Sequence, residues 1–225
     1  MRHETNANSI NNTIWINPFE LKLFSPPPNW WWYSRLEKRI KIKIIKKFLE
    51  KIALGKLYYG GNWDLSAKQF KDTDWKKNVR SLKLNYEDYK KSSWYQFINS
   101  QIKKNGFYYY KKNKIKNIDE LNEFFEKYLK KLIKSIETDG FILENYDDKD
   151  VPKVLISRDG NLIKTGNGCH RLAIIQEFSI KCKYPIQIVG IHKKFNINGV
   201  KSNLLQLKDI YRFISDEYSM NFSNK

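Results

Sequence analysis

The sequence predicts an α/β fold of the α+β kind, with a helical, aromatic-rich extension preceding the α/β part. Three observations carry this prediction. An amphipathic helical pattern runs from Ile118 to about Thr138, with apolar residues recurring every three or four positions. Two short apolar segments then follow, joined by the turn-forming pair Asp159-Gly160. A glycine turn, a second helical pattern and a buried-strand pattern at 184–192 complete the series.

The composition supports a folded domain with a preference for anionic partners. The 225 residues are 41% hydrophobic and 15% aromatic, so a sizeable core can form, and the many aromatic residues are untypical of a disordered chain. Lys and Arg number 42 against 24 Asp and Glu, a formal charge of +18. This excess favours nucleotides, nucleic acid or an anionic membrane surface as partners. The alternative is a Lys-, Asn- and Ile-rich composition that reflects an AT-rich genome, and the excess of Lys over Arg fits it, so the charge alone is weak evidence for nucleic acid.

Cysteine content and hydropathy limit the class further. The chain has two cysteines, Cys169 and Cys182, which are too few for a disulfide framework or a cysteine-based zinc site. The first thirteen residues are polar and lack the apolar stretch of a signal peptide. No window of 18 or more uncharged apolar residues is present, so no transmembrane segment is predicted. These features predict a cytoplasmic protein with reduced thiols.

Composition shifts divide the chain into four expected parts. They are a disordered leader (1–13), a helical and irregular extension packed on the core (14–117), an α/β core (118–195), and a C-terminal tail with a short helix (196–225). The tail helix is predicted from the apolar positions between Leu204 and Ile214.

Within the extension, the patterns are mixed. Residues 14–24 predict an extended segment or a one-turn helix, and the tryptophans at 30–32 either pack on the core or form a base-stacking platform. Residues 36–55 fit either a basic amphipathic helix or a strand. Residues 58–79 predict a glycine turn and irregular structure with Trp63 and Trp75 as core anchors, and residues 85–106 predict a helix that ends at Gly106.

The α/β core predicts a site for phosphate in the stretch "TGNGCHRLAIIQEF", residues 165–178. Here a strand, a glycine turn and a helix N-terminus follow one another. The first turn of a helix presents unpaired N–H groups and partial positive charge, and Gly166 and Gly168 allow a close backbone approach. Arg171 can bind phosphate through two N–H groups, and His170 can donate a hydrogen bond or move a proton.

Five further residues are candidates for contacts with the same nucleotide. Asn167 and Cys169 belong to the turn itself, and Lys164 precedes it on the predicted strand, where it could reach a phosphate. His192 closes the last predicted strand and points either to the nucleotide, as residues at strand ends often do, or to solvent. Arg158 flanks the predicted hairpin, and its side chain either reaches a phosphate or is solvated.

These residues carry a family resemblance. The segments "LIKSIETDG", "VLISRDGNLIKTGNGCHRLA" and "YPIQIVGI", between about Leu121 and His192, resemble the ParB/sulfiredoxin superfamily in content and order. The resemblance implies a ParB/sulfiredoxin-like fold and a nucleotide site in which the turn, His170 and Arg171 hold phosphates. ATP or ADP, or CTP, together with Mg²⁺, is the cofactor that it implies. Upstream, "GGNWD" at residues 60–64 is similar to the "GGDWD" of uncharacterised members that also carry "GxHRLA".

The superfamily offers several activities, and the residues distinguish them only in part. Sulfiredoxin-like thiol repair would use Cys169 as nucleophile, with its pKa lowered by the helix N-terminus and Arg171. Kinases of free serine use an acidic residue where this chain has Asn167, and an upstream glutamate base for which Glu20 is the candidate by position. A DNA clamp would need a helix-turn-helix domain, and too few residues follow His192 for one. A nuclease would need a carboxylate cluster, which is not evident.

The predicted function is therefore nucleotide binding with ATP-dependent phosphotransfer to a small molecule of unknown identity. His170, Cys169 and Glu20 are the candidate catalytic residues. The alternatives are a non-catalytic nucleic-acid-binding module and Cys169-based thiol repair. No metal-ligating residues are predicted.

Overall fold

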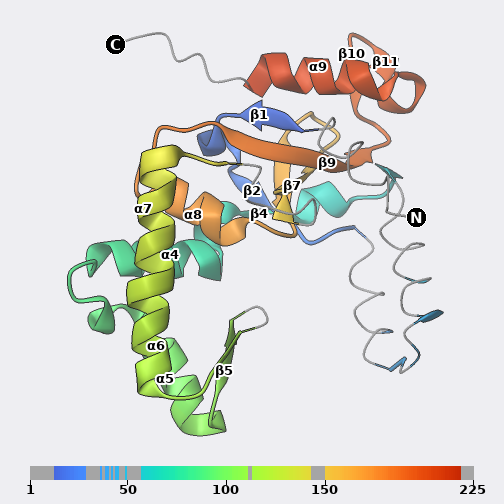
Figure 1. The fold of residues 1–225 in the computed structure, drawn as a ribbon. Helices are drawn as coiled ribbons and strands as arrows, with labels where there is room; N and C mark the ends of the chain where they lie inside the picture. Colours follow the sequence, from blue (N-terminus) through green and yellow to red (C-terminus); the bar gives the residue numbers. More distant parts are fainter. Residues whose placement is uncertain are drawn as a thin grey trace, which may run out of the picture. The chain divides into compact units, whose positions relative to one another are not determined.

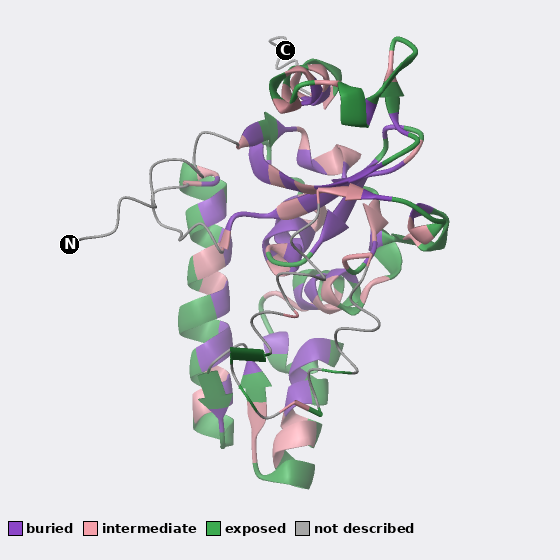
Figure 2. Cartoon of the chain, turned by 90° about the vertical axis from the view of Figure 1, so that its right-hand side faces the viewer, coloured by how far each residue is buried: buried purple, intermediate pink, exposed green. Residues whose placement is uncertain are grey.

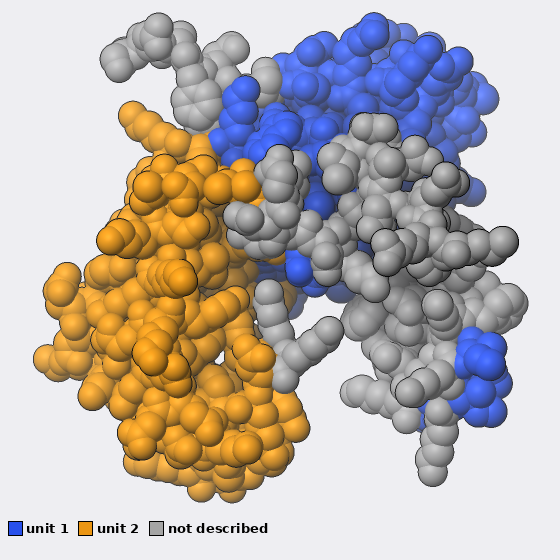
Figure 3. All heavy atoms as spheres, viewed as in Figure 1, with its two compact units in different colours: residues 1–70, 143–169, 183–225 blue, residues 71–142, 170–182 orange. Residues whose placement is uncertain are grey.

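The computed structural model describes residues 13–28, 57–110, 113–142 and 150–218, together with isolated positions between 36 and 49. The chain divides into two compact units, coloured separately in Figure 3. Unit 1 comprises residues 1–70, 143–169 and 183–225, and unit 2 comprises residues 71–142 and 170–182.

Unit 1 is built on a mixed seven-stranded sheet (Figure 1). Its strand order is β1-β9-β7-β8-β2-β4, and β3 also pairs with β9. The strands are β1 (Ile14–Ile16), β2 (Leu23–Phe24), β3 (Tyr58–Tyr59), β4 (Lys68–Gln69), β7 (Lys153–Ile156), β8 (Leu162–Thr165) and β9 (Tyr184–His192).

The central strands of this sheet are the ones predicted from apolar runs. β7 and β8 form an antiparallel hairpin in which Lys153 pairs with Thr165 and Ile156 with Leu162. β9 runs parallel to β7 and is buried along most of its length, as continuous apolar strands in a parallel pairing are. The pairing slips by one residue between Val154 and Leu155, which marks a β-bulge.

Helical and hairpin segments complete unit 1. They are η1 (Pro18–Glu20), η2 (Trp63–Ser66), the hairpin of β10 (Asn196–Ile197) and β11 (Val200–Lys201), η8 (Ser202–Leu204) and α9 (Leu207–Tyr218). Helix α9 lies alongside β1 (Figure 1), and its buried residues are Ile210 and Ile214. The N–H of Asn17 donates to the carbonyl of Tyr218 at 3.0 Å, which fixes the end of α9 to the start of η1.

Unit 2 is helical with one small hairpin. Its elements are α4 (Asp74–Leu84), η4 (Tyr89–Lys91), α5 (Ser93–Asn105), β5 (Tyr108–Tyr110), β6 (Asn113–Ile115), α6 (Ile118–Glu123), the π-helical segment η5 (Phe124–Leu129) and α7 (Lys130–Asp139). The helix α8 (Cys169–Glu177) starts at the last residue of a unit 1 segment and continues into unit 2, and η3 (Phe70–Asp72) crosses the boundary after Phe70.

The helix ends follow from local side-chain chemistry. Thr73, Ser92 and Asn117 each accept a hydrogen bond from a backbone N–H in the first turn of α4, α5 and α6 respectively. Gly106 ends α5 in the left-handed conformation, at φ 78°. The long helix from Ile118 to Asp139 is continuous, and Figure 2 shows buried and exposed residues alternating along it.

The α+β class is confirmed, and so are the hairpin, the long helix, the strand 184–192 and the tail helix. Segment 14–24 contains both expected forms, two short strands and a turn of 3-10 helix. The prediction of irregular structure up to residue 79 was wrong, because Thr73 caps a regular helix there, and Trp75 in that helix is only half-buried. The helix predicted from residue 85 begins at Ser93, since Ser92 is its cap.

Three predictions lie outside the described residues, wholly or largely: the leader, the tryptophans at 30–32 and the helix-or-strand choice at 36–55. In the described part of the chain, no helix is both long enough and apolar enough to cross a membrane.

Candidate functional site

The glycine turn lies between β8 and α8, where the sequence predicted it. β8 ends at Thr165 and α8 begins at Cys169. Gly166 and Gly168 have φ of 55° and 92°, the left-handed region in which a side chain is strained. A Cβ on Gly168 would stand 2.9 Å from the Tyr184 hydroxyl oxygen and 3.0 Å from Pro152, so only glycine fits there.

The buried ammonium group of Lys164 binds the backbone carbonyls of this turn from the interior of the protein. Lys164 is fully buried, and its ammonium group donates hydrogen bonds to the carbonyls of Lys153 (3.2 Å), Thr165 and Asn167. A lysine ammonium has three donors, so three carbonyls can satisfy it completely. The predicted contact between Lys164 and a phosphate is therefore replaced by a different role, because the ammonium is already surrounded by backbone oxygens.

These hydrogen bonds set the direction of two backbone N–H groups. In a trans peptide the C=O and N–H bonds point in opposite directions. The carbonyl of Thr165 shares its peptide with the N–H of Gly166, and that of Asn167 with the N–H of Gly168. Both carbonyls point to the Lys164 ammonium, so both N–H groups point away from it. Among the described residues, neither N–H donates to another group, and Gly166 and Asn167 are exposed.

The Cys169 thiol faces into the protein. Cys169 is buried, and its Sγ lies 3.2 Å from the carbonyl oxygen of Gly166, to which the thiol donates. Burial raises the pKa of the thiol, and the charge of Lys164 and the backbone N–H of Cys169 offset this only in part. The expectation of a lowered pKa for Cys169 is therefore wrong, because desolvation outweighs the favourable charges.

The side chains of His170 and Arg171 belong to the aromatic interior of unit 2. The His170 ring stacks on Trp94, with centroids 5.3 Å apart and planes at 11°, and meets Tyr110 edge-on. The Arg171 guanidinium lies 5.0 Å from the ring centre of Phe141, and the residue is buried.

His192 does not join the turn. Thr165 pairs with Lys153, which in turn pairs with Gln187 of the parallel strand β9. His192 is five residues further along β9, so it stands at the opposite end of the sheet, roughly 17 Å from the level of the turn. His192 does lie at the C-terminal end of β9, as predicted. Because β8 runs antiparallel to β7 and β9, its C-terminal end and the turn that follows lie at the opposite end of the strands.

Glu20 is separated from the turn for a similar reason. It ends η1, just before β2, and β2 runs parallel to β8 with Leu23 paired to Ile163. Residues preceding β2 therefore lie toward the start of β8, whereas the turn follows its end. The Glu20 carboxylate instead forms an ion pair with Lys22 at 3.2 Å. The assignment of Glu20 as a base for chemistry at the turn is thus not supported by the strand directions.

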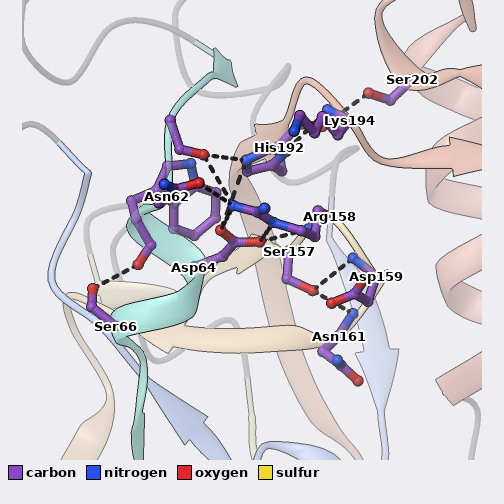
Figure 4. A network of polar contacts seen from close by, with 12 residues as sticks. Asn62, Asp64, Ser66, Ser157, Arg158, Asp159, Asn161, His192, Lys194 and Ser202 are labelled. Carbon is purple, nitrogen blue, oxygen red and sulfur yellow. Dashed lines mark hydrogen bonds and ion pairs between the residues drawn. The ribbon is translucent and has the colours of Figure 1, made fainter.

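A polar network occupies the opposite end of the sheet from the turn (Figure 4). The Asp64 carboxylate accepts hydrogen bonds from Nε and Nη2 of Arg158, both at 2.8 Å, and from the backbone N–H of Arg158 at 3.0 Å. The same guanidinium donates to the carbonyl of Gly61 and the side chain of Asn62. Arg158 therefore ties the β7–β8 hairpin turn to the "GGNWD" segment.

His192 completes this network through both ring nitrogens. The backbone N–H of Lys194 donates to its Nδ1 at 3.0 Å, and its Nε2 lies 2.9 Å from the carbonyl oxygen of Gly61. Nε2 is also 3.7 Å from the Asp64 carboxylate, and the Trp63 ring lies against the imidazole. His192 is buried, which places it in a structural role within unit 1.

The electrostatics of Asp64 follow from these contacts. Burial of the carboxylate is the largest single effect and raises its pKa, but hydrogen bonds from Arg158 and the charges of His192 and Arg158 together outweigh it. The pKa of Asp64 is consequently lowered to about 2. Sequence reasoning had not connected Asp64 with Arg158, and the resemblance of "GGNWD" to "GGDWD" was the one signal that pointed to this segment.

Among the described residues, no group of three or more His, Cys, Asp or Glu side chains is arranged to hold a metal ion. Comparisons with protein-family models, with curated proteins and with solved structures find no match to this chain.

Proposed function

We propose that unit 1 binds the phosphate groups of a nucleotide at the turn formed by Gly166, Asn167 and Gly168. On this proposal the protein is a ParB/sulfiredoxin-like nucleotide-binding protein, with ATP or ADP as the preferred ligand and CTP as the alternative. The observation that carries the proposal is the buried Lys164 ammonium, which draws two turn carbonyls inward and leaves the N–H groups of Gly166 and Gly168 directed outward.

Two physical features of the turn favour an anion. The N–H groups of Gly166 and Gly168, on either side of Asn167, offer two donors within one turn, and turn N–H groups of this kind bind phosphate. The positive charge of Lys164 lies directly beneath the turn, and a buried charge is screened far less by salt than a surface one.

The reaction class that we propose is transfer of the terminal phosphoryl group of ATP to a small molecule. Phosphoryl transfer needs alignment and charge neutralisation more than covalent chemistry by the protein, and the turn supplies part of both. Mg²⁺ would neutralise phosphate oxygens, and it commonly retains several waters and only one or two carboxylate ligands. We assign no residue to the metal or to the base. Cys169-based repair is not proposed, because the thiol is buried and its pKa is raised.

A ligand panel tests this proposal. Thermal unfolding would be measured with ATP, ADP, CTP, GTP and a DNA oligomer, each with and without Mg²⁺. A nucleotide at about 100 times its dissociation constant should stabilise the protein by roughly 2.7 kcal/mol. Stabilisation by ATP or ADP supports the proposal, and ADP release in a metabolite screen would then identify the phosphoryl acceptor.

The second candidate, nucleic-acid binding, rests on the charge of +18. It predicts that the DNA oligomer alone stabilises the protein, with an affinity that falls steeply as salt increases. This result, with no response to any nucleotide, would overturn the phosphate-site proposal.

A further inference from the structure

We propose that a second pocket in unit 1, at the tip of the β7–β8 hairpin, binds a small organic cation that carries an amine or guanidinium group. The pocket has a volume of about 470 Å³, within the usual range for small-molecule sites. Its walls include Arg158 and Asp159 of the hairpin turn, Phe195, and Phe213, Glu217 and Tyr218 of α9 or its end.

The pocket is held in shape by interactions that need no ligand. The Tyr218 hydroxyl donates to the carbonyl of Gly160 at 3.1 Å, which joins α9 to the hairpin tip. Gly160 has φ of 83°, and a Cβ there would come within 3.2 Å of the Phe195 ring, so the hairpin backbone packs directly on that ring. Arg158 is fixed by its two-point contact with Asp64 (Figure 4). A preformed pocket of this kind loses little conformational entropy when it binds a ligand.

The charges of the pocket favour a cation, in contrast to the chain as a whole. Asp159 and Glu217 are exposed acidic residues, and neither forms an ion pair within the described part of the chain. Arg158, the one basic residue among the described residues of the lining, is paired with the Asp64 carboxylate and also interacts with the charge of Asp159, so acidic groups still outnumber it. The pocket therefore carries an excess of negative charge on a protein whose formal charge is +18.

The aromatic residues of the lining also favour a cationic ligand. The rings of Phe195 and Phe213 have centroids 6.1 Å apart with planes inclined by 56°, and the Tyr218 ring also contributes to the lining. Inclined aromatic rings with nearby carboxylates attract organic ammonium and guanidinium groups through cation–π and charge interactions, whereas a hydrated inorganic ion gains little from the rings. The ligand class is therefore an amine or guanidinium attached to a short apolar body.

This pocket is distinct from the glycine turn. The two lie at opposite ends of β8, whose four residues span roughly 13 Å. The inference therefore does not depend on nucleotide binding, and either site can fail its test while the other passes.

The test is a titration of the full chain by two-dimensional amide NMR with 1,5-diaminopentane, with the uncharged 1,5-pentanediol as matched ligand. We expect the diamine to shift the amide signals of Gly160, Phe195 and Tyr218, and to bind more tightly than the diol.

Glu217→Gln and Asp159→Asn should each weaken diamine binding by about two- to fivefold. Phe213→Leu, which keeps an apolar side chain without the ring, should weaken it by a similar factor. Asp72→Asn, an exposed carboxylate that does not line the pocket, should leave it unchanged.

Equal binding of diamine and diol, shifts confined to other residues, or an affinity that survives both charge removals would overturn the inference. Nα-acetyl-lysine amide, titrated in parallel, distinguishes a free amine from a lysine side chain presented by a peptide. Tighter binding of this amide than of the diamine would assign the pocket to a peptide. The reverse order would assign it to a metabolite, and both outcomes keep the cationic ligand class.

Discussion

A buried ammonium group is costly unless hydrogen bonds replace its hydration, and Lys164 meets this requirement with three carbonyl oxygens. The same contacts organise the turn that follows, because each carbonyl drawn toward the ammonium turns the adjoining N–H outward. One residue thus connects the stability of the hairpin with the proposed binding of phosphate.

Replacement of this residue provides the first prediction. Lys164→Met keeps the apolar stem but leaves three carbonyls without the ammonium, so we expect the free energy of unfolding to fall by about 1–3 kcal/mol. Urea denaturation measures the loss. Lys183→Met, at an exposed position of unit 1, should change stability by no more than about 0.5 kcal/mol. Equal effects of the two replacements would show that the Lys164 contacts contribute nothing.

Asp64 gives a pH-dependent prediction. Its pKa is about 2 in the folded protein, below the ordinary value of 3.8. A carboxylate whose pKa is lowered by folding stabilises the native state above its unfolded pKa, and this contribution disappears as pH falls from about 4 toward 2. At pH 7, Asp64→Asn should therefore cost about 1–3 kcal/mol, and the difference from the parent should shrink in acid. Urea titrations at pH 7, 4 and 3 measure it; a difference independent of pH would contradict the ion-pair account.

Cys169 gives a prediction about reactivity. Burial raises the pKa of its thiol, so the thiolate fraction at neutral pH is small and access is limited. We expect iodoacetamide to modify Cys169 in the native protein more slowly than it modifies glutathione at pH 7.5, as measured by mass spectrometry. Cys169→Ala should retain nucleotide binding. Modification faster than that of glutathione would restore Cys169 as a candidate nucleophile.

At the scale of elements, strand packing depends on one position in β9. A Cβ on Gly190 would stand 2.5 Å from Leu155 Cδ2 and 2.9 Å from the Tyr59 ring, because β9 is paired on both sides here, next to the bulge that its own Val189 forms. Gly190→Ala should therefore destabilise the protein by about 1–3 kcal/mol through overpacking. Gly60→Ala, whose Cβ would meet only the flexible Lys193 side chain at 3.8 Å, is the matched control. Thermal unfolding compares them, and equal midpoints would refute the packing argument.

Elements with a local signal were predictable, and elements defined by long-range pairing were not. The helix 118–138 and the strand 184–192 have periodic patterns long enough to be read from the chain. The two-residue strands β2, β3 and β4 have none, and each exists because a distant strand offers backbone partners. Helix α4 was missed although Thr73 is a normal N-cap, since its few apolar residues did not stand out.

The whole molecule shows why the site was only partly predictable. The turn was identified from adjacent residues, because strand, glycines and helix follow one another in the chain. The roles of Lys164 and His192 depend on strand direction, which no local pattern encodes: Lys164 points under the turn, whereas His192 lies at the other end of the sheet. The Asp64–Arg158 pair joins residues 94 positions apart, and only the folded sheet brings them together.

The central claim is that the outward N–H groups of the glycine turn bind nucleotide phosphates, and isothermal titration with ATP tests it most directly. Gly168→Ala forces the turn to move, because the added Cβ meets Tyr184 and Pro152, whereas Gly199→Ala has the same left-handed strain in open space. We predict that Gly168→Ala weakens ATP binding about tenfold or more and that Gly199→Ala leaves it unchanged, with both variants folded by circular dichroism. The account would be contradicted by ATP binding of equal affinity in the parent and Gly168→Ala, or by no binding to the parent.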